Sequence, residues 1–263
     1  MDSLQKALAF LSILPQRPQE FVERVFQIID YRFDRLFRKR PDYEVVNWES
    51  LLQDMEEYFG QVLDILDEPA LGNIEEKVNQ HLKNIESKAP FSLICNADRS
   101  LARGCYLACR LLKPEIVLET GVAHGVTSAY ILRALEENGV GKLCSVELPP
   151  PGLRADEFVG AAIPEDLKGR WHLYYGFSKQ VLPKLLGEVE TVDVFVHDSC
   201  HTYRCMKREF ETVWPHMRSG SMIIADDIEI HSAFNELKKR GLAFQRVVKE
   251  VDKQSLFGVA VRT

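Results

Sequence analysis

The stretch "EIVLETGVAHGVTSAYILRALEEN", residues 115–138, joins a short β-branched run to a helix-like segment through a loop that contains two glycines. A second apolar run, "GKLCSVEL" at 141–148, follows directly. Apolar runs of this length on either side of a helical segment indicate a βαβ unit, in which two parallel strands flank a crossover helix. The stretch therefore predicts a parallel sheet that is covered by helices.

The same alternation continues to the end of the sequence. The further runs are "WHLYYG" at 171–176, "VDVFVHDS" at 192–199, "GSMIIADD" at 220–227, "AFQRVVKEV" at 243–251 and "SLFGVAVRT" at 255–263. Helix-like segments separate them, the last being "HSAFNELKKR" at 231–240, except that only "DKQ" lies between the final two runs. So short a connection favours a hairpin and an antiparallel last strand. We predict an α/β fold with a Rossmann-like, doubly wound, seven-stranded and mostly parallel sheet.

Residues 1–112 have a different sequence pattern, in which one helix-like segment follows another without β-branched runs between them. These segments are "QEFVERVFQIIDYRFDRLF", "NWESLLQDMEEYFGQVLDIL", "NIEEKVNQHLKNIE" and "NADRSLARGCYLACRLL". Apolar residues recur in them at steps of three and four, as a helix with one apolar face requires. We therefore divide the chain into a helical N-terminal extension, 1–112, and a sheet domain, 113–263. The extension is expected to form a lid, part of a substrate pocket or the interface of a homodimer.

The charge and the cysteine content of the sequence indicate which partners the protein binds and in which cellular compartment it is found. The net charge of -6 argues against nucleic acid, and the basic cluster "RFDRLFRKR" at 32–40 is expected to be a solvated helix face. Six cysteines without a Cys-x-x-Cys pair suit a reducing compartment. The first residues fit a helix better than a signal peptide, and no apolar run approaches the roughly 20 residues of a membrane span. We expect a cytoplasmic protein without a membrane partner.

The loop after the first strand indicates which ligand the sheet binds, because ligands of open parallel sheets lie beyond the carboxyl ends of the strands. Gly121 and Gly125 allow a sharp turn and a close approach to a ligand, and Thr127 or Ser128 can open the next helix. A dinucleotide site would need two more glycines, where this chain has Ala123 and Val126. The Gly-Lys-Ser/Thr of a P-loop is also absent from the sequence.

Two acids end the first two strands, Glu119 and Glu147. A carboxylate at Glu147 can accept hydrogen bonds from both ribose hydroxyls of a nucleoside, and one at Glu119 from the cationic amino-acid end of a ligand. The pair suits a nucleoside that carries positive charge rather than phosphate.

With these features, residues 115–263 resemble the class I S-adenosylmethionine-dependent methyltransferases. "ETGVAHG" stands where that family has Glu/Asp-x-Gly-x-Gly-x-Gly, with Ala123 in place of the middle glycine. "GFSKQVLPKLL" at 176–186 is similar to the stretch that turns toward the adenine, which implies a contact from Ser178. The resemblance implies S-adenosylmethionine as cofactor, bound by residues Glu119, Gly121, Gly125, Thr127, Glu147 and Ser178.

Carboxylates also end the fourth and fifth strands, namely Asp198 and the pair Asp226 and Asp227. Adjacent parallel strands place these three groups at one rim of the sheet, where they repel one another unless protons or a cation lie between them. Oxygen ligands of this kind favour Mg²⁺, which keeps open positions for substrate oxygens. The arrangement resembles the metal-dependent O-methyltransferases of the catechol O-methyltransferase type, and "DSCHTY" looks like bacterial relatives that act on sugars and macrolides. The resemblance implies Asp198, Asp226 and Asp227 as metal ligands.

His201 stands where the catechol type has its lysine base. Methyl transfer to a hydroxyl requires that the alcohol lose its proton, and an imidazole is well matched to accept it near neutral pH. We predict that His201 is the base, with a structural role or metal ligation as alternatives. His197 precedes Asp198 and therefore alternates to the other side of the strand, where it is expected to be structural. Three further expectations concern smaller features. His124 is expected to be an exposed loop residue, with a contact to cofactor or substrate as the alternative. Tyr203 is expected to pack on its helix rather than reach the site, and 91–106 is expected to line the substrate entrance.

Two other classes of function compete with an O-methyltransferase that acts on a small hydroxyl-bearing molecule. The first is a non-haem iron oxygenase that uses His197, Asp198 and His201. The second is a non-catalytic binding protein on the methyltransferase fold, with its partner on the N-terminal helices. The acceptor itself, whether phenol, sugar or small acid, is not specified by the sequence.

Overall fold

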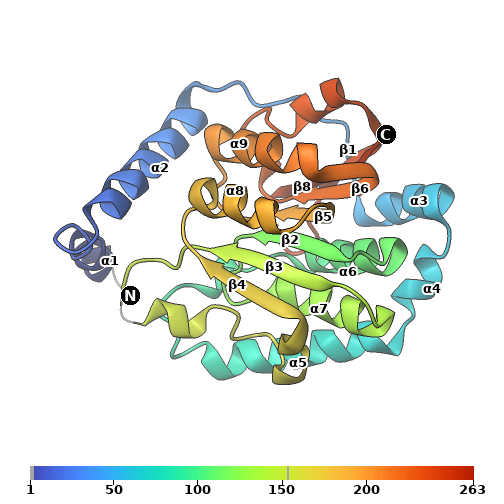
Figure 1. Ribbon diagram of the computed structural model, residues 1–263, viewed down its shortest axis with the longest axis horizontal. Coiled ribbons are helices and arrows are strands. Elements are labelled where there is room, and N and C mark those ends of the chain that lie inside the picture. The colour runs from blue at the N-terminus through green and yellow to red at the C-terminus, as the bar shows by residue number, and fades with distance from the viewer. Residues whose placement is uncertain (1–2, 153) are drawn as a thin grey trace.

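The computed structural model describes residues 3–152 and 154–263, and within them the strands form one eight-stranded sheet (Figure 1). The strand order is β1-β7-β8-β6-β5-β2-β3-β4. The strands are β1 Val45–Val46, β2 Ile116–Thr120, β3 Lys142–Glu147, β4 Trp171–Tyr175, β5 Val192–His197, β6 Met217–Ala225, β7 Leu242–Lys249 and β8 Leu256–Arg262. Only β8 runs antiparallel to its neighbours, β6 and β7, among the described strands. The mostly parallel sheet and the closing hairpin are confirmed.

The sheet has one strand more than the seven that we predicted. The additional strand is β1, whose two valines pair in parallel with Val247 and Val248 at the outer side of β7. Two residues are too few to give the alternation by which a strand is recognised. The prediction of seven strands is therefore wrong by this edge strand, which comes from the N-terminal extension.

The helices agree with the predicted segments in most places. They are α1 Ser3–Leu11, α2 Pro18–Phe37, α3 Trp48–Phe59, α4 Val62–Leu66, α5 Pro69–Ile85, α6 Arg99–Leu112, α7 Val126–Asn138, α8 Ser178–Glu188 and α9 Tyr203–Val213. Short 3₁₀ turns are η1 Leu93–Cys95, η2 Ala155–Phe158, η3 Glu165–Arg170, η4 Trp214–His216, η5 Ile228–Ile230 and η6 Asn235–Arg240.

Two helix predictions need correction. The single helix expected over 47–66 is split into α3 and α4, because Gly60 and Gln61 both adopt positive φ angles. The carboxylate of Glu56 accepts a hydrogen bond of 2.7 Å from the amide of Val62 at the start of α4. The segment 231–240 is not an α-helix but contains the 3₁₀ turn η6.

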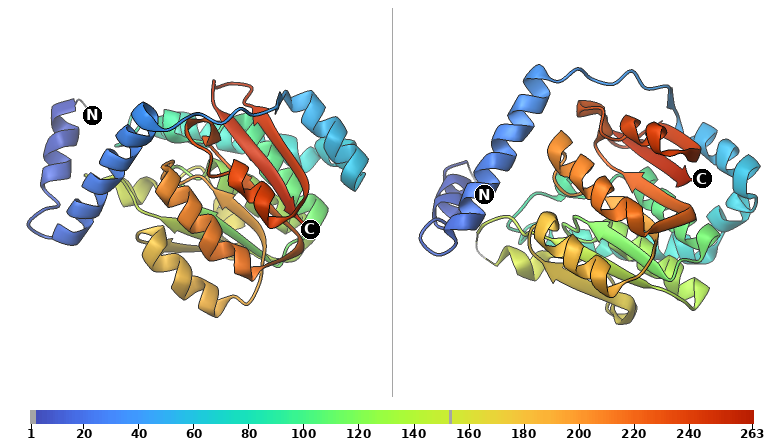
Figure 2. Two further views of the ribbon diagram at one scale, coloured as in Figure 1. Left: turned by 90° about the horizontal axis from the view of Figure 1, so that it is seen from above. Right: turned by 45° about the horizontal axis from the view of Figure 1, so that its top comes forward.

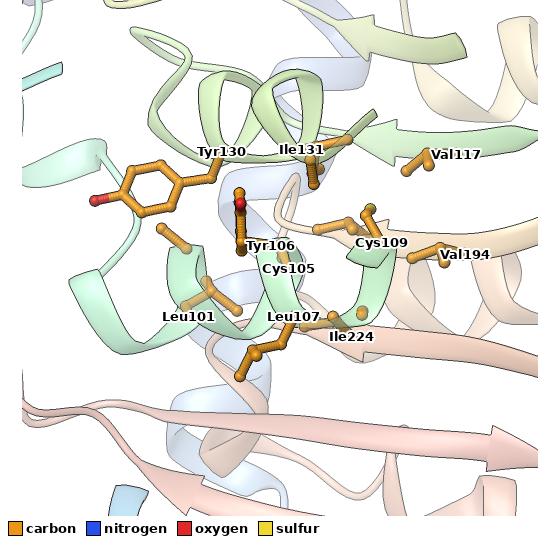
Figure 3. Close-up of a cluster of buried hydrophobic side chains, with 14 of the residues drawn as sticks. Leu101, Cys105, Tyr106, Leu107, Cys109, Val117, Tyr130, Ile131, Val194 and Ile224 are labelled. Atoms are coloured by element: carbon orange, nitrogen blue, oxygen red, sulfur yellow. The ribbon is translucent and has the colours of Figure 1, made fainter. Parts of the chain in front are cut away.

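Helices cover both faces of the sheet (Figure 1). On one face, α8 and α9 pack against the side chains of Leu118 and Phe195. On the other face, α6 and α7 pack against Val117 and Val194, as the close-up in Figure 3 shows for Cys105, Cys109 and Ile131. Successive residues of β2 and β5 thus point to opposite layers, as the period of a strand requires. No disulfide joins any of the six cysteines that the structure describes.

The N-terminal extension contributes to two different parts of the molecule. Buried side chains of α3, α5 and α6 belong to the same hydrophobic cluster as the sheet. Helices α1 and α2 instead lie at the periphery, on the side toward which β2, β3 and β4 point (Figures 1 and 2). The predicted roles as lid, pocket wall or interface therefore concern α1 and α2. Over the described residues, no helix combines the length and the apolar character needed to cross a bilayer.

Candidate active site

The loop between β2 and α7 passes very close to the end of β5. Gly121 has a φ of +85°, and a Cβ atom there would lie 1.8 Å from the carbonyl oxygen of Asp198. Gly125 has a φ of +87° and forms the N-cap of α7. Neither Thr127 nor Ser128 opens this helix, which corrects that expectation. Gly121 is therefore needed both for its backbone conformation and for the close approach to β5, whereas Gly125 is needed for its backbone conformation and for the close approach of Gly160.

Gly121→Ala is expected to lower the free energy of unfolding by about 4 kcal/mol or more, because a methyl group would displace the end of β5. Gly139→Ala is the matched control, since Gly139 has a φ of +70° with no atom within 4 Å of an added Cβ. The control is expected to lose only about 1 kcal/mol through backbone strain. Urea denaturation of both variants measures the difference, and equal losses would contradict the close approach.

Glu147 connects the loop to the end of β3. Its Oε2 atom accepts hydrogen bonds from the amides of Val122 at 2.6 Å and Ala123 at 2.9 Å. The residue also lines a cavity of about 830 Å³ that opens at this edge of the sheet. Ser178, the first residue of α8, lines the same cavity. Both residues are thus placed where a ligand in the cavity can contact them.

Glu119 lies beneath the loop and is fully buried. Its Oε2 atom accepts hydrogen bonds of 2.7 Å from the hydroxyls of Ser128 and Ser145. The cavity wall includes neither Glu119 nor Gly125 nor Thr127, which is buried in the first turn of α7. In this structure, Glu119 therefore does not reach the cavity where the sequence predicts that it contacts the ligand. Its hydrogen bonds instead join α7 and β3 behind the loop.

Burial raises the pKa of Glu119 to about 7 from an ordinary value of 4.5. A carboxyl group with a raised folded-state pKa stabilises the fold below pH 4.5, and this contribution is lost as the pH rises through 7. In the wild type, the free energy of unfolding is expected to fall by about 3 kcal/mol between pH 4.5 and pH 7 through this group, and Glu119→Gln is expected to abolish that fall. Chemical denaturation at several pH values measures this change, with Glu115→Gln, at an exposed residue directly before β2, as control. Parallel pH curves for wild type and Glu119→Gln would refute this assignment.

The acidic cluster forms where β5 and β6 end side by side. The amide of Asp198 donates to the carbonyl of Thr120 at 2.8 Å, and the amide of Asp226 donates to that of His197 at 2.9 Å. Asp198, His201 and Asp226 each offer a ligand atom, and these atoms lie within 4.8 Å of one another. The Oδ1 atom of Asp226 is buried without a hydrogen-bond partner among the described residues. The cluster faces the same cavity as Glu147.

Burial raises the pKa of Asp198 well above its usual range, and the negative charges of Asp226 and Asp227 raise it further. Burial also raises the pKa of Asp226, with Asp227 again adding to the shift. Carboxylates that repel one another in this way are stabilised by a bound cation. The oxygen donors fit a hard divalent ion such as Mg²⁺.

His201 lies between the carboxylates. Its Nε2 atom is 3.7 Å from Oδ1 of Asp198 and 3.5 Å from Oδ2 of Asp227. Asp227 itself has a left-handed backbone, with a φ of +51°. All four residues line the cavity, so the structure brings the predicted metal ligands and the predicted base together. The compact donor group contains His201 in place of Asp227.

His197 is directed away from this cluster. Its Nδ1 atom lies 2.6 Å from Oε2 of Glu209 on α9, and both side chains are fully buried. Burial alone would raise the pKa of Glu209, but the charge and hydrogen bond of His197 outweigh it and hold this pKa at about 2. The side of the strand predicted for His197 is thus confirmed. The structure does not bring His197, Asp198 and His201 together as an iron site would require.

Several residues of the cavity wall were missed from the sequence. They are Phe10 of α1, Arg24 and Gln27 of α2, and Lys253 of the last hairpin. The ammonium group of Lys253 donates to the carbonyl of Asn96 at 2.6 Å, and its charge lowers the pKa of Asp198. The sequence indicates only a turn at "DKQ", and no local pattern shows that this turn reaches the carboxylates.

Three smaller expectations can be compared with the structure. His124 is fully buried rather than exposed, and its ring stacks on Phe91 with a centroid distance of 4.1 Å. Burial lowers the pKa of His124 to about 4. Tyr203 packs as expected, with the guanidinium of Arg38 above its ring at 3.7 Å from the centroid. Part of the segment 91–106 lines the cavity, through Phe91, Ser92, Ile94 and Cys95.

Comparison with known proteins agrees with this fold and loop. Residues 118–228, less than half of the chain, match a family model described as a methyltransferase domain. An O-methyltransferase from Bacillus cereus in complex with SAH superposes with a TM-score of 0.57 at 14% identity, over 81% of this chain and 100% of that one. The O-methyltransferase TomG from Streptomyces achromogenes, involved in tomaymycin synthesis and in complex with SAM, superposes with a TM-score of 0.54 at 15% identity. That alignment covers 80% of this chain and 96% of TomG. A search of curated proteins found no significant match.

Residues 118–228 are thus a methyltransferase domain, and the chain as a whole has the fold of the class I methyltransferases. The resemblance inferred from the sequence is confirmed, and the protein is an enzyme of the methyltransferase class.

Proposed function

We propose that the protein transfers a methyl group from S-adenosylmethionine to a hydroxyl of a small molecule, with Mg²⁺ assistance and with His201 as base. The observation that carries this proposal is the position of the acidic cluster. Asp198, Asp226 and His201 face the same cavity as the glycine loop and Glu147. A donor site and an acceptor site in one cavity are what a direct methyl transfer requires.

The residues of the glycine loop, Glu147 and Ser178 would hold the methyl donor. Gly121 lets the backbone pass without a side chain between the cavity and β5, and Glu147 presents a carboxylate to the ribose hydroxyls. When bound, S-adenosylmethionine supplies an electrophilic methyl carbon on a sulfonium. The O-methyltransferase from Bacillus cereus holds SAH and TomG holds SAM, which supports this choice of cofactor.

Asp198 and Asp226 would hold the metal ion, together with Asp227. The raised pKa values of Asp198 and Asp226 and the buried, unpaired Oδ1 of Asp226 within the described chain fit a cation at this position. When bound there, a divalent ion would lower the pKa of the acceptor hydroxyl. His201 accepts that proton, and the charge of its imidazolium is balanced by Asp198 and Asp227.

The reaction is an in-line displacement with a simple balance of atoms and charges. The acceptor oxygen forms a bond to the methyl carbon while the bond from that carbon to sulfur breaks. The hydroxyl proton goes to His201, and the sulfur leaves as a neutral thioether. Protein groups contribute by holding the oxygen, the carbon and the sulfur in line.

The acceptor is expected to bind between the acidic cluster and the N-terminal residues of the wall. Phe91 and Ile94 provide apolar contacts on this side, whereas Arg24 and Lys253 provide positive charge. The segment 91–106 therefore keeps its proposed role at the entrance. A cytoplasmic location, proposed from the cysteines, suits the use of S-adenosylmethionine as a soluble donor.

Glu147→Ala is expected to weaken S-adenosylmethionine binding by roughly 10- to 100-fold, because hydrogen bonds to a charged partner contribute about 1.5–3 kcal/mol. Isothermal calorimetry measures the change, and a thermal melt shows whether the loop remains folded. Glu157→Ala is the control, since Glu157 is an exposed carboxylate whose described ion pair is with Arg154. Equal affinities for wild type and Glu147→Ala would contradict the proposed donor site.

A further inference from the structure

Helix α2 has its polar side toward the protein and its apolar side toward solvent, which is the reverse of an ordinary surface helix. The guanidinium of Arg24 donates to the carbonyl of Pro149 at 2.6 Å, and the carboxylate of Asp34 accepts from the amide of Tyr203 at 2.7 Å. Two ion pairs add to this side, Glu23 with Lys179 and Asp30 with Arg204. Polar contacts thus attach the helix to the rest of the chain.

The outward side of α2 carries a regular row of large apolar residues. This outer stripe consists of Val22, Phe26, Ile29, Phe33 and Leu36, whose exposed fractions are 46%, 52%, 53%, 51% and 74%. The steps between them are four, three, four and three residues. That alternation is the 3.5-residue period by which one helix packs along another.

Helices α1 and α2 lie next to each other at one edge of the molecule (Figure 2). Leu8 and Leu11 of α1, the neighbouring Leu14, and Phe37 at the end of α2 are also exposed. An aromatic side chain has roughly 200 Å² of surface, so the three exposed phenylalanines of α2 leave roughly 300 Å² open. With the aliphatic residues, the total is on the order of the 800 Å² that each partner contributes to a standard interface. A patch of this size on a soluble chain marks an interaction surface.

We infer that the outer stripe is the interface of a homodimer, in which α2 packs against α2 of a second copy of this chain. A heptad stripe on a single helix is complementary to itself, as a two-fold interface requires. The ion pairs that attach α2 to the rest of the chain, such as Glu23 with Lys179 and Asp30 with Arg204, lie on its inner side. They leave the outer stripe apolar, as the core of a homodimer interface requires. The centre of the contact is expected near Ile29, in the middle of the stripe.

This interface also bears on the cavity, because α2 contributes Arg24 and Gln27 to its wall. Packing against a second copy holds α2 from the outside, while its polar contacts hold it from the inside. The part of the wall that comes from α2 is thus fixed in the dimer. The dimer itself does not depend on which methyl acceptor the enzyme uses.

Analytical ultracentrifugation of the full chain tests the interface. Wild type is expected to sediment with twice the chain mass of 30.1 kDa at micromolar concentration. Ile29→Glu is expected to weaken association at least 100-fold, and Leu63→Glu is the control, since Leu63 is 57% exposed on α4 and outside the stripe. A wild type that stays at 30.1 kDa up to 100-fold higher concentration, or an Ile29→Glu variant that remains dimeric, would overturn the inference.

Cysteine cross-linking tests the direct contact between the two stripes. Under mild oxidation, at least one of the stripe variants Phe26→Cys, Ile29→Cys and Phe33→Cys is expected to form a covalent dimer, whereas Leu63→Cys on α4, outside the stripe, is not. Cross-linking of Leu63→Cys but of none of the stripe variants would refute this interface. Sedimentation of a monomeric wild type with vesicles of three parts phosphatidylcholine to one part phosphatidylserine would assign the stripe to a membrane surface instead, and would overturn the dimer.

Discussion

Asp226→Asn will lower the rate of methyl transfer by roughly 10³-fold or more, while the affinity for S-adenosylmethionine changes less than about twofold. The reason is the position of Asp226 within the acidic cluster. Its side chain is buried beside Asp198 and His201, in the proposed metal site. The proposed donor site is formed by other residues of the same cavity, among them Glu147. Loss of one ligand charge removes the stabilisation of the ionised acceptor and leaves donor binding intact.

The same substitution will stabilise the metal-free protein. Burial and, after it, the negative charge of Asp227 raise the pKa of Asp226, so holding these carboxylates together lowers the stability of the fold. An uncharged amide at this position relieves that repulsion, and the site is an example of stability given up for function. Product formation with catechol as trial acceptor, measured against Mg²⁺ concentration, and urea denaturation in chelator give the two readings.

Asp166→Asn is the control for both measurements, because Asp166 is an exposed carboxylate on η3. It should change neither turnover nor stability. If Asp226→Asn retained full turnover with an unchanged dependence on Mg²⁺, the metal site proposed for the acidic cluster would be wrong.

His201→Ala will lower turnover by about 10²- to 10⁴-fold, the usual contribution of a general base. Because a base acts only when it is unprotonated, the wild-type rate will rise with pH up to a plateau, and the variant will lose this rise. His201→Lys, which restores the residue type of the catechol class, is expected to recover part of the activity at higher pH. Stopped assays from pH 5 to pH 9 at saturating Mg²⁺ and donor measure these profiles.

The affinity for Mg²⁺ distinguishes the two roles that the geometry leaves to His201. As a base, His201 can be removed with little change in Mg²⁺ affinity, because Asp198, Asp226 and Asp227 remain. As a ligand, its removal would weaken Mg²⁺ binding in parallel with turnover. Calorimetric titration of Mg²⁺ into wild type and His201→Ala separates the two, and a parallel loss would contradict the assignment as base.

The sheet could be predicted from the sequence because its signals are local. Each long strand is an apolar run, each crossover helix is a periodic segment, and the short "DKQ" connection reveals the hairpin. Strand β1 was not predictable in this way, since two valines carry no period. The division of 47–66 into two helices depends on the backbone at Gly60 and Gln61, where Gln61 is not a residue type that marks a break.

The site was predictable as far as it is built from strand ends. Asp198, Asp226 and Glu147 follow apolar runs, and adjacent parallel strands bring such residues to one edge. Lys253 and Arg24 reach the same cavity through tertiary packing of a hairpin and a distant helix, which no spacing in the sequence encodes. Glu119 is a strand-end acid too, but the loop covers it, so its burial depends on the path of residues 121–125.

Calorimetric titration of the purified full chain with S-adenosylmethionine, in the presence and absence of Mg²⁺, tests the central claim most directly. We predict one donor site per chain with a dissociation constant of roughly micromolar size, about -8 kcal/mol, that persists without the ion. A catechol trial ligand is then expected to bind the donor complex only when Mg²⁺ is present. Absence of any S-adenosylmethionine binding by the folded protein, with or without Mg²⁺, would contradict the proposed methyl transfer.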